Sequence, residues 1–203
     1  MKNSISTPTF PSLLQQFFVE RLTQQKNASP RTVATYRDTF RLLLVFAQHR
    51  LHKPPADLTL AEWDAAQILA FLDHIEKERH NSIRSRNARL SAIRSFLNYA
   101  ALRDPLALST IHCVLAIPIK RFERPLMDFF SREEIDAILN APDPTTWFGQ
   151  RDRVMFATLY NTGARVSELI GMTVKDILLD NSPSMRILGK GRKERTLPLW
   201  HRT

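Results

Sequence analysis

Two short stretches of the 203-residue sequence combine residue types that can act on a phosphate group. Arg165 precedes Glu168 by three residues, so the two side chains share a face if the stretch is helical. Gly189-Lys190-Gly191-Arg192-Lys193 places three cations on a glycine-containing turn. A guanidinium can hold two phosphate oxygens in a planar fork, and a lysine can donate a proton to a departing oxygen. An ordinary surface ion pair and a solvated turn would contain the same residues, so the residue types alone leave both interpretations open.

The elements that must position these residues are predicted from turn signals and hydrophobic periodicity. Asn161-Thr162-Gly163 predicts a turn between a helix at about Gln150–Tyr160 and a short helix that contains Arg165 and ends near Gly171. The periodicity then changes, and β-branched residues and leucines predict a small antiparallel sheet in which the glycine-containing turn joins two strands. The segments with this composition are Val174–Leu179, Met185–Leu188 and Thr196–Leu199.

The first 116 residues show the three- and four-residue spacing of amphipathic helices. We expect Ser12 to cap a first helix and Ser29-Pro30 to open a second, because serine is a favourable N-cap and proline is tolerated in a first turn. A third helix is predicted around Trp63–Ile75, and a fourth runs from Ser82 to about Leu102. The chain is therefore predicted to be mainly α, with the small antiparallel β-sheet near residue 190.

A proline-flanked, basic stretch separates two predicted domains. Ile117–Pro125 is typical of an extended linker, and Ser131 with Glu134 three residues later forms a capping box that begins a new helix. The resulting division is a helical domain at residues 1–116, a linker at 117–127 and an α+β domain at 128–203.

Positive charge is concentrated in the first domain. The chain has 29 Lys and Arg against 20 Asp and Glu, a net charge of +9. Residues 1–120 hold 16 basic and 9 acidic side chains, whereas residues 121–203 hold 13 and 11. The stretch from Arg79 to Arg103, which includes the fourth helix, has six arginines and no acidic residue. Such an excess favours a polyanionic partner such as a nucleic acid, for which the first domain is the better candidate.

Candidate DNA-contacting side chains come from two helices and the glycine-containing turn. In the fourth helix, the face opposite the predicted buried stripe is small and polar (Ala88, Ser91, Ala92 and Ser95), which would allow close approach to DNA. A solvated basic face on a helical bundle is the open alternative. The candidates are Arg31, Arg37, Arg84, Arg86, Arg89, Arg94, Arg192 and Lys193.

Other classes of protein are disfavoured. Cys113 is the only cysteine, which excludes an intrachain disulfide, and we expect it to be a buried apolar thiol. The histidines lack a metal-ligand spacing, so no metal or other cofactor is predicted. No phosphate-cradling glycine motif is found, which weighs against an ATP-driven enzyme. The N-terminus lacks an apolar signal core and the longest apolar run, Leu42–Ala47, is too short for a membrane span, so we expect a cytoplasmic protein without a membrane partner.

The motifs taken together resemble one family. Tyr160–Leu169 (YNTGARVSEL) resembles the first catalytic box of tyrosine-type site-specific DNA recombinases, the phage-integrase and Xer-like group. Ile187–Arg195 (ILGKGRKER), followed by Pro198-Leu199, resembles the β-hairpin that carries the same family's catalytic lysine. Ser29–Thr32 (SPRT) and Asn87–Phe96 (NARLSAIRSF) resemble parts of its helical, SAM-like core-binding domain. The resemblance covers nearly the whole chain.

The resemblance implies double-stranded DNA as the partner and site-specific recombination or integration as the activity, without a cofactor. It implies that Arg165 clamps the reacting phosphate, that Lys190 is the general acid, and that Glu168 supports the geometry of the site. It also implies a core-binding domain followed by the first part of a catalytic domain, with a second copy or a full-length recombinase as a possible partner on DNA.

The sequence departs from the family pattern after residue 199. The His-x-x-Arg box, the later His or Trp, and the tyrosine nucleophile are not found, and Tyr36, Tyr99 and Tyr160 all precede Arg165. No nucleophile is assigned, and the chain is expected to be truncated and catalytically incomplete, because covalent catalysis requires one. The alternative is a non-catalytic DNA-binding protein that competes with or modulates a full-length recombinase.

Overall fold

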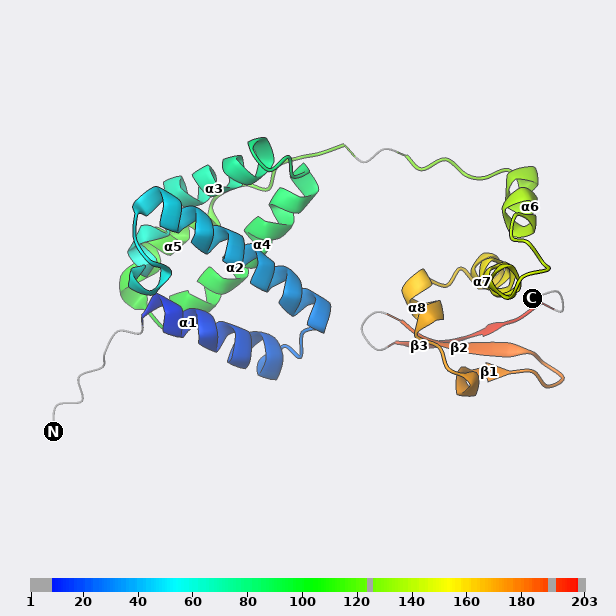
Figure 1. Cartoon of the computed structure of the whole chain (residues 1–203). Helices are drawn as coiled ribbons and strands as arrows, with labels where there is room; N and C mark the ends of the chain where they lie inside the picture. Colours follow the sequence, from blue (N-terminus) through cyan, green and yellow to red (C-terminus); the bar gives the residue numbers. More distant parts are fainter. Residues whose placement is uncertain (1–8, 124–125, 190–192, 201–203) are drawn as a thin grey trace. The chain divides into compact units, whose positions relative to one another are not determined.

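The structure is a computed structural model that describes residues 9–123, 126–189 and 193–200. The chain divides into two compact units, Met1–Arg124 (unit 1) and Pro125–Thr203 (unit 2) (Figure 1). Unit 1 is helical, and unit 2 combines helices with a three-stranded antiparallel sheet. The predicted class, mainly α with a small antiparallel sheet, is therefore confirmed.

Unit 1 consists of amphipathic helices whose first turns are set by local capping. Ser29 Oγ accepts a hydrogen bond from the Thr32 N–H, and Ser82 Oγ accepts one from Ser85, which satisfies amide groups that a helix start leaves unpaired. Short 3₁₀ turns lie at Pro55–Asp57, Leu60–Glu62 and Pro105–Ala107. The longer elements are α1 Phe10–Gln16, a π-helical continuation at Phe17–Gln25, α2 Pro30–Leu51, α3 Ala65–Lys77, α4 Ile83–Ala101 and α5 Leu108–Leu115.

Aromatic side chains form the centre of the unit 1 core. Phe17 is fully buried, and its ring contacts those of Phe40 and Phe96 at centroid distances of 6.3 and 5.6 Å. Phe40 and Phe96 contact each other at 5.3 Å. Edge-to-face contacts of this kind add about 0.5–1.5 kcal/mol per pair beyond the area they bury. The cluster holds α2 and α4, the two arginine-bearing helices, against the first helical segment.

Two predictions for unit 1 are wrong, and one helix was not predicted. Helix α1 begins at Phe10 with Thr9 as its N-cap, so Ser12 lies inside the first turn. Helix α5 was not predicted, because its eight residues are too few for a clear periodic pattern. Cys113 is exposed rather than buried, because α5 turns Ile111 and Val114 toward the core instead.

The first residues of the predicted linker belong to unit 1. Ile117 is 5% exposed and packs in its core. The buried Asn87 side chain donates to the Lys120 carbonyl at 2.7 Å and accepts from the Lys120 N–H at 3.1 Å. Lys120 Nζ also pairs with Glu76 of α3. Residues 117–120 of the predicted linker therefore pack against α3 and α4 of unit 1.

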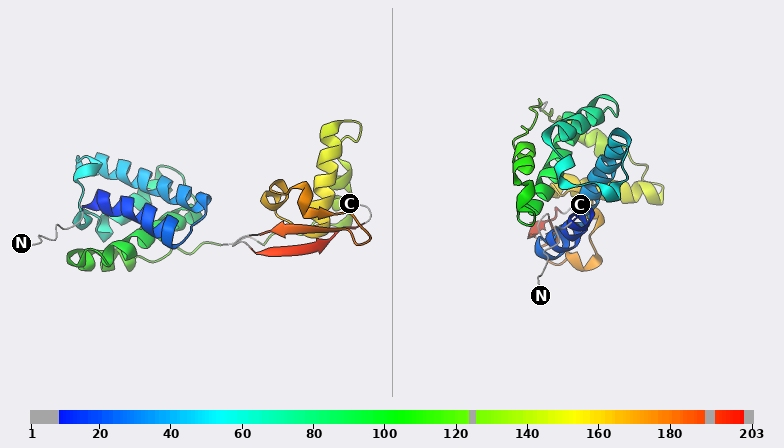
Figure 2. Two further views of the ribbon diagram at one scale, coloured as in Figure 1. Left: turned by 90° about the horizontal axis from the view of Figure 1, so that it is seen from below. Right: turned by 90° about the vertical axis from the view of Figure 1, so that its left-hand side faces the viewer.

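Unit 2 contains α6 Arg132–Asn140, α7 Trp147–Thr162 and α8 Val166–Ile170, followed by a 3₁₀ turn at Val174–Asp176 and the strands β1 Ile177–Leu178, β2 Ser184–Leu188 and β3 Glu194–Pro198. The predicted capping box is present, since Ser131 and Glu134 exchange hydrogen bonds. The predicted hairpin of β2 and β3 is confirmed (Figure 2). Ile187 pairs with Arg195 in its register. The first half of the predicted first strand, Val174–Asp176, is instead the 3₁₀ turn, and only Ile177–Leu178 pairs as a strand.

Unit 2 buries few of its apolar side chains. In the described residues of unit 2, only Met185 and Ile187 are buried hydrophobics, and both face the same side of β2. Trp147, Phe148, Val154, Val166 and Ile170 on the helices are more than half exposed. An exposed apolar surface of this extent marks a contact surface or an aggregation liability.

Candidate active site

The centre of the candidate site is the Glu168 carboxylate, which three donors hold. Glu168 Oε2 accepts the Arg165 backbone N–H at 2.9 Å, and Oε1 accepts the Arg165 guanidinium at 2.8 Å. From strand β3, the Arg195 guanidinium donates to Oε2 at 2.8 Å and to Oε1 at 3.4 Å. The Glu168 side chain is only 5% exposed. Charge-assisted bonds to a buried carboxylate fix its position, and with it the positions of both arginines.

Local sequence places Arg165 at the start of α8. Gly163 ends α7 with a φ of +60°, a left-handed conformation that glycine adopts without strain. Thr162 Oγ1 accepts the Ala164 N–H at 3.2 Å, and Arg165 is the N-cap residue of α8. Glu168 stands three residues later and returns its carboxylate to the Arg165 N–H, which completes the capping arrangement.

The β2–β3 turn begins directly beside the carboxylate. A Cβ atom at Gly189 would lie 3.2 Å from Arg195 Nη1 and 3.2 Å from Glu168 Oε1, so only glycine fits there without displacing the ion pair. The Gly189 N–H donates to the Lys193 carbonyl at 2.8 Å and closes the turn. Lys190 and Arg192 lie outside the described residues, but Gly189, which immediately precedes Lys190, is packed against Glu168.

These contacts strongly favour the ionised form of Glu168. The hydrogen bond from the Arg165 N–H, followed by the Arg195 guanidinium, lowers the pKa of the Glu168 carboxyl to about 2. The carboxylate is therefore charged throughout the physiological pH range and keeps both arginines paired.

Arg165 remains available to a ligand despite its bond to Glu168. Its side chain is 67% exposed, whereas that of Arg195 is 37% exposed. A guanidinium has five N–H donors, and the contact with Oε1 uses only Nη1. The Arg165 guanidinium can therefore present its remaining N–H groups to a phosphate while Glu168 fixes the backbone and Nη1 of the same residue.

Sequence reasoning missed Arg195. Its position two residues after Lys193 shows only another cation in a basic turn, and 27 residues separate it from Glu168. The alternation of side chains along a strand could have indicated its role, because it places Arg195 on the same face as Leu197. Both side chains are partly buried in the structure.

The candidate arginines of unit 1 form two groups. Arg31, Arg37 and Arg84 are exposed, and the structure shows no partner for their guanidinium groups among the described residues. Arg89 is partly buried, and its Nε has no hydrogen-bond partner within the described part of the chain. Burial lowers the pKa of Arg89, and the charge of Arg79 lowers it further, although an arginine stays protonated.

Arg86 and Arg94 have internal partners instead. Arg86 is 6% exposed and lies 3.4 Å from Glu76, and Arg94 donates to the Leu115 carbonyl. Both side chains join α4 to neighbouring elements, which does not agree with the expectation of a solvent-facing DNA contact. Ala92, predicted on the exposed polar face, is fully buried. Most of the predicted stripe is buried, but the buried face of the helix is wider than predicted because Phe96 and Tyr99 also enter the core.

The described residues contain neither a cluster of metal ligands nor a membrane-spanning helix. Across residues 9–123, 126–189 and 193–200, no three His, Cys, Asp or Glu side chains are grouped as metal ligands. In the same stretches no helix is long and apolar enough to cross a membrane.

Comparison with known proteins identifies the family. Residues 14–104 match the profile of the phage integrase N-terminal SAM-like domain, and residues 128–202 match that of the phage integrase family. The putative integrase/recombinase y4rD of Sinorhizobium fredii is 47% identical over 188 residues, which are 92% of this chain and 67% of that protein. This chain belongs to the phage integrase family of tyrosine recombinases. The related protein y4rC of S. fredii is 50% identical over 186 residues, which are 92% of this chain and 56% of y4rC.

More distant members of the family extend the comparison. Tyrosine recombinase XerC of Staphylococcus epidermidis is 33% identical over 186 residues, 91% of this chain and 59% of XerC. Among solved structures, the XerH recombinase bound to its palindromic difH substrate has a TM-score of 0.62 at 22% identity, covering 86% of this chain and 50% of XerH. This likeness shows a shared fold. The chain thus spans between half and two thirds of the length of these phage integrase relatives.

Proposed function

We propose that this phage integrase family member binds duplex DNA through unit 1 and contributes two residues to a site for site-specific strand cleavage, Arg165 and Lys190. The observation that supports the proposal most is the Glu168 carboxylate, buried between Arg165 and Arg195 and in contact with Gly189. The carboxylate links the start of α8, where Arg165 lies, to Gly189, the residue that precedes Lys190 in the sequence. A surface ion pair in solvent would not need this arrangement.

The proposed chemistry is charge stabilisation and proton donation at one phosphodiester. During cleavage, negative charge grows on the two non-bridging oxygens, and the Arg165 guanidinium stabilises it with N–H donors that Glu168 does not occupy. Lys190 donates a proton to the 5′ oxygen as its bond to phosphorus breaks. Glu168 and Arg195 position these groups without touching the phosphate. No residue of this chain is assigned as the nucleophile.

DNA binding by unit 1 is supported by unpaired positive charge on α2 and α4. Arg31, Arg37 and Arg84 are exposed, and Arg89 is partly desolvated with an unsatisfied Nε. A cation that has already lost water gains more from a phosphate than a fully hydrated one does, because less solvent remains to be removed. Lys193 adds an exposed cation in unit 2.

The salt dependence of DNA binding tests the role of unit 1. The dissociation constant for a random-sequence duplex is measured by fluorescence anisotropy across a series of salt concentrations. Removing one phosphate contact lowers the slope of log K against log salt by roughly 1. We expect this change for Arg89→Gln and no change for Arg132→Gln, a matched removal of an exposed arginine on α6. Equal slopes for all three proteins would overturn the assignment of Arg89.

Neutral phosphate substitution tests the role of Arg165. Duplexes selected by this chain from a random pool receive a methylphosphonate at one position at a time. At one position, the methylphosphonate should weaken DNA binding by the unsubstituted protein about tenfold, which is equivalent to about 1.4 kcal/mol. Arg165→Ala should lose nothing further at that position, whereas Arg151→Ala should behave as the unsubstituted protein. If Arg165→Ala is as sensitive as the unsubstituted protein at every position, Arg165 contacts no phosphate.

The alternative function, non-catalytic competition with a longer recombinase, shares the DNA contacts and differs in chemistry. A selected duplex with a nick beside the sensitive phosphate traps a covalent protein–DNA adduct only when a nucleophile attacks. We expect no adduct with this chain alone. Recovery of an adduct would show that one of Tyr36, Tyr99 and Tyr160, or another residue of the chain, acts as a nucleophile.

A further inference from the structure

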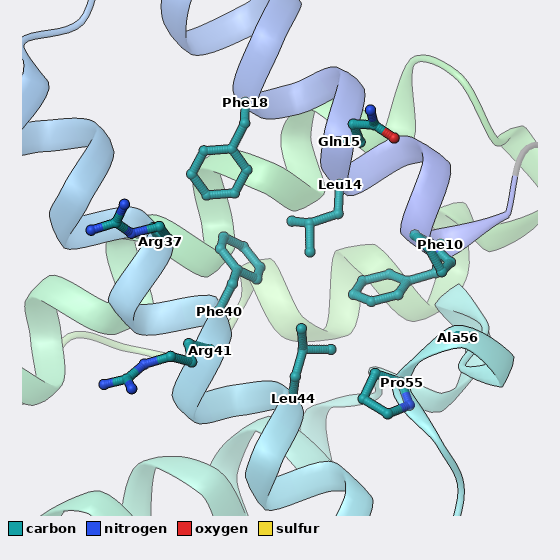
Figure 3. A pocket seen from close by; sticks show the side chains of 11 residues that line it. Phe10, Leu14, Gln15, Phe18, Arg37, Phe40, Arg41, Leu44, Pro55 and Ala56 are labelled. Atoms are coloured by element: carbon teal, nitrogen blue, oxygen red, sulfur yellow. The ribbon is translucent and has the colours of Figure 1, made fainter.

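An apolar groove of about 630 Å³ lies between α1 and α2 in unit 1 (Figure 3). Its lining residues all precede residue 57 in the sequence and include none of the candidate active-site residues. Its walls come from both helices and from the 3₁₀ turn that follows α2. Its volume is within the range of pockets that accept small ligands or side chains. The apolar lining includes Phe10, Leu14, Phe18, Phe40, Leu44 and Pro55.

Two arginines on α2 give the groove a positive rim. Arg37 and Arg41 are both exposed, and their guanidinium groups point away from the apolar side chains (Figure 3). No lining residue in the described part of the chain is acidic, and the structure shows no ion pair for either arginine. The groove therefore suits an occupant that combines large apolar side chains with a carboxylate.

The same chain carries a segment of that composition at Leu126–Phe130, with the sequence Leu-Met-Asp-Phe-Phe. Leu126, Met127 and Phe129 are 95%, 87% and 98% exposed, among the highest values for large apolar residues in the described chain. Asp128 at the centre of the segment is exposed, and no ion pair is found for it within the described residues. Contiguous exposed apolar residues of this kind mark a binding segment.

We propose that the groove between α1 and α2 accepts the Leu126–Phe130 segment of a second copy of this chain, with Asp128 pairing with Arg41. Apolar side chains of the segment fill the floor and the carboxylate meets the positive rim, so hydrophobicity and charge are both complementary. Because each copy has one groove and one segment, two reciprocal contacts close a symmetric dimer. Each contact buries only a five-residue segment, so we expect a weak dimer that dissociates on dilution, as transient complexes do.

Charge reversal with mixing tests the proposal. Sedimentation velocity is measured on the 203-residue chain from roughly 1 to 300 µM, a range suited to interfaces of small area. Arg41→Glu and Asp128→Arg, each alone, place like charges together at both contacts, and each should weaken dimerisation by about tenfold or more. An equimolar mixture of the two variants should dimerise as the unsubstituted protein does. In the mixed dimer the two substituted side chains meet at one contact with their charges exchanged, and the other contact keeps Arg41 and Asp128.

Matched variants separate this contact from general association of the exposed apolar surface on unit 2. Arg132→Glu reverses an exposed arginine outside the groove and should leave dimerisation unchanged, whereas Phe129→Ser should weaken it without a change in charge. Circular dichroism confirms that each variant is folded. The proposal is overturned if the unsubstituted chain is monomeric throughout, if neither reversal weakens association, or if the mixture fails to restore it. Failure of the DNA-binding tests would leave this result unaffected.

Discussion

Arg195 on strand β3 donates to Glu168 on helix α8 at 2.8 Å, across 27 residues of sequence. Glu168 is also bonded to Arg165, so this contact links the start of α8 to the β2–β3 hairpin. Neither the helix nor the hairpin could hold both cations alone. In this phage integrase family member, the position of Arg165 relative to Gly189, the residue before Lys190 in the sequence, depends on Arg195, to which no chemical step is assigned.

Replacing Arg195 with Gln should loosen the hairpin. The variant keeps a polar side chain but removes the charge that faces Glu168, so Gly189 loses the rigid surface against which it packs. We expect the Gly189 amide, which bonds to the Lys193 carbonyl, to exchange hydrogen for deuterium faster by about tenfold, as expected for a loss of about 1.4 kcal/mol in local stability. Arg186→Gln is the control, because Arg186 lies on the exposed side of β2. Equal exchange rates in the two variants would contradict a positioning role for Arg195.

Glu168→Gln should change how the stability of unit 2 responds to acid. The folded-state pKa of Glu168 is about 2, below its ordinary value of 4.5. A carboxyl with a lowered pKa stabilises the fold fully above its ordinary pKa, and this contribution is lost as the pH falls from about 4.5 to about 2. In that interval, the thermal unfolding midpoint of the unsubstituted protein should fall toward the midpoint of Glu168→Gln. Above pH 5, the difference between the two midpoints should be constant. A difference that does not narrow in acid would show that Glu168 is not ionised against the arginines.

Gly189→Ala should disturb the same cluster by its volume alone. The added methyl group would lie 3.2 Å from both Arg195 Nη1 and Glu168 Oε1, so the ion pair must shift by a few tenths of an ångström. We expect a destabilisation of about 1 kcal/mol, at the low end of overpacking costs because side-chain ends can move. Gly171→Ala is the comparison, since its methyl group would lie at an ordinary 3.4 Å from the Ser167 carbonyl. Urea unfolding followed by amide exchange of β2 and β3 distinguishes the two variants.

Limited proteolysis should divide the chain into a resistant unit 1 and a sensitive unit 2. The unit 1 core contains Phe17, Phe71 and Phe96, all fully buried, whereas the described part of unit 2 buries only Met185 and Ile187 among its hydrophobic residues. Sparse burial lowers the free energy of local opening, and proteases cut the opened state. Mass spectrometry of a time course should show a stable fragment ending between Lys120 and Arg132. Equal resistance of both units would contradict this expectation.

Local chemistry was sufficient to predict several features from the sequence. Ser29-Pro30 opens α2 and Ser131 with Glu134 opens α6, because each capping interaction involves residues only three apart. The β2–β3 hairpin was predictable from glycines between two strand-like segments. The Arg165–Glu168 pair follows from the same short spacing, together with the family resemblance of the two motifs.

Only the tertiary structure decided which cations remain free and which are used internally. Arg84, Arg86 and Arg89 are equivalent in the sequence pattern, yet Arg86 is buried beside Glu76 because α3 packs on that side of α4. Arg195 meets Glu168 only because the β2–β3 hairpin packs against α8. Caps and turns are set by backbone groups a few residues apart, whereas an ion pair between residues distant in sequence forms only once the packing of their elements has brought the two side chains together.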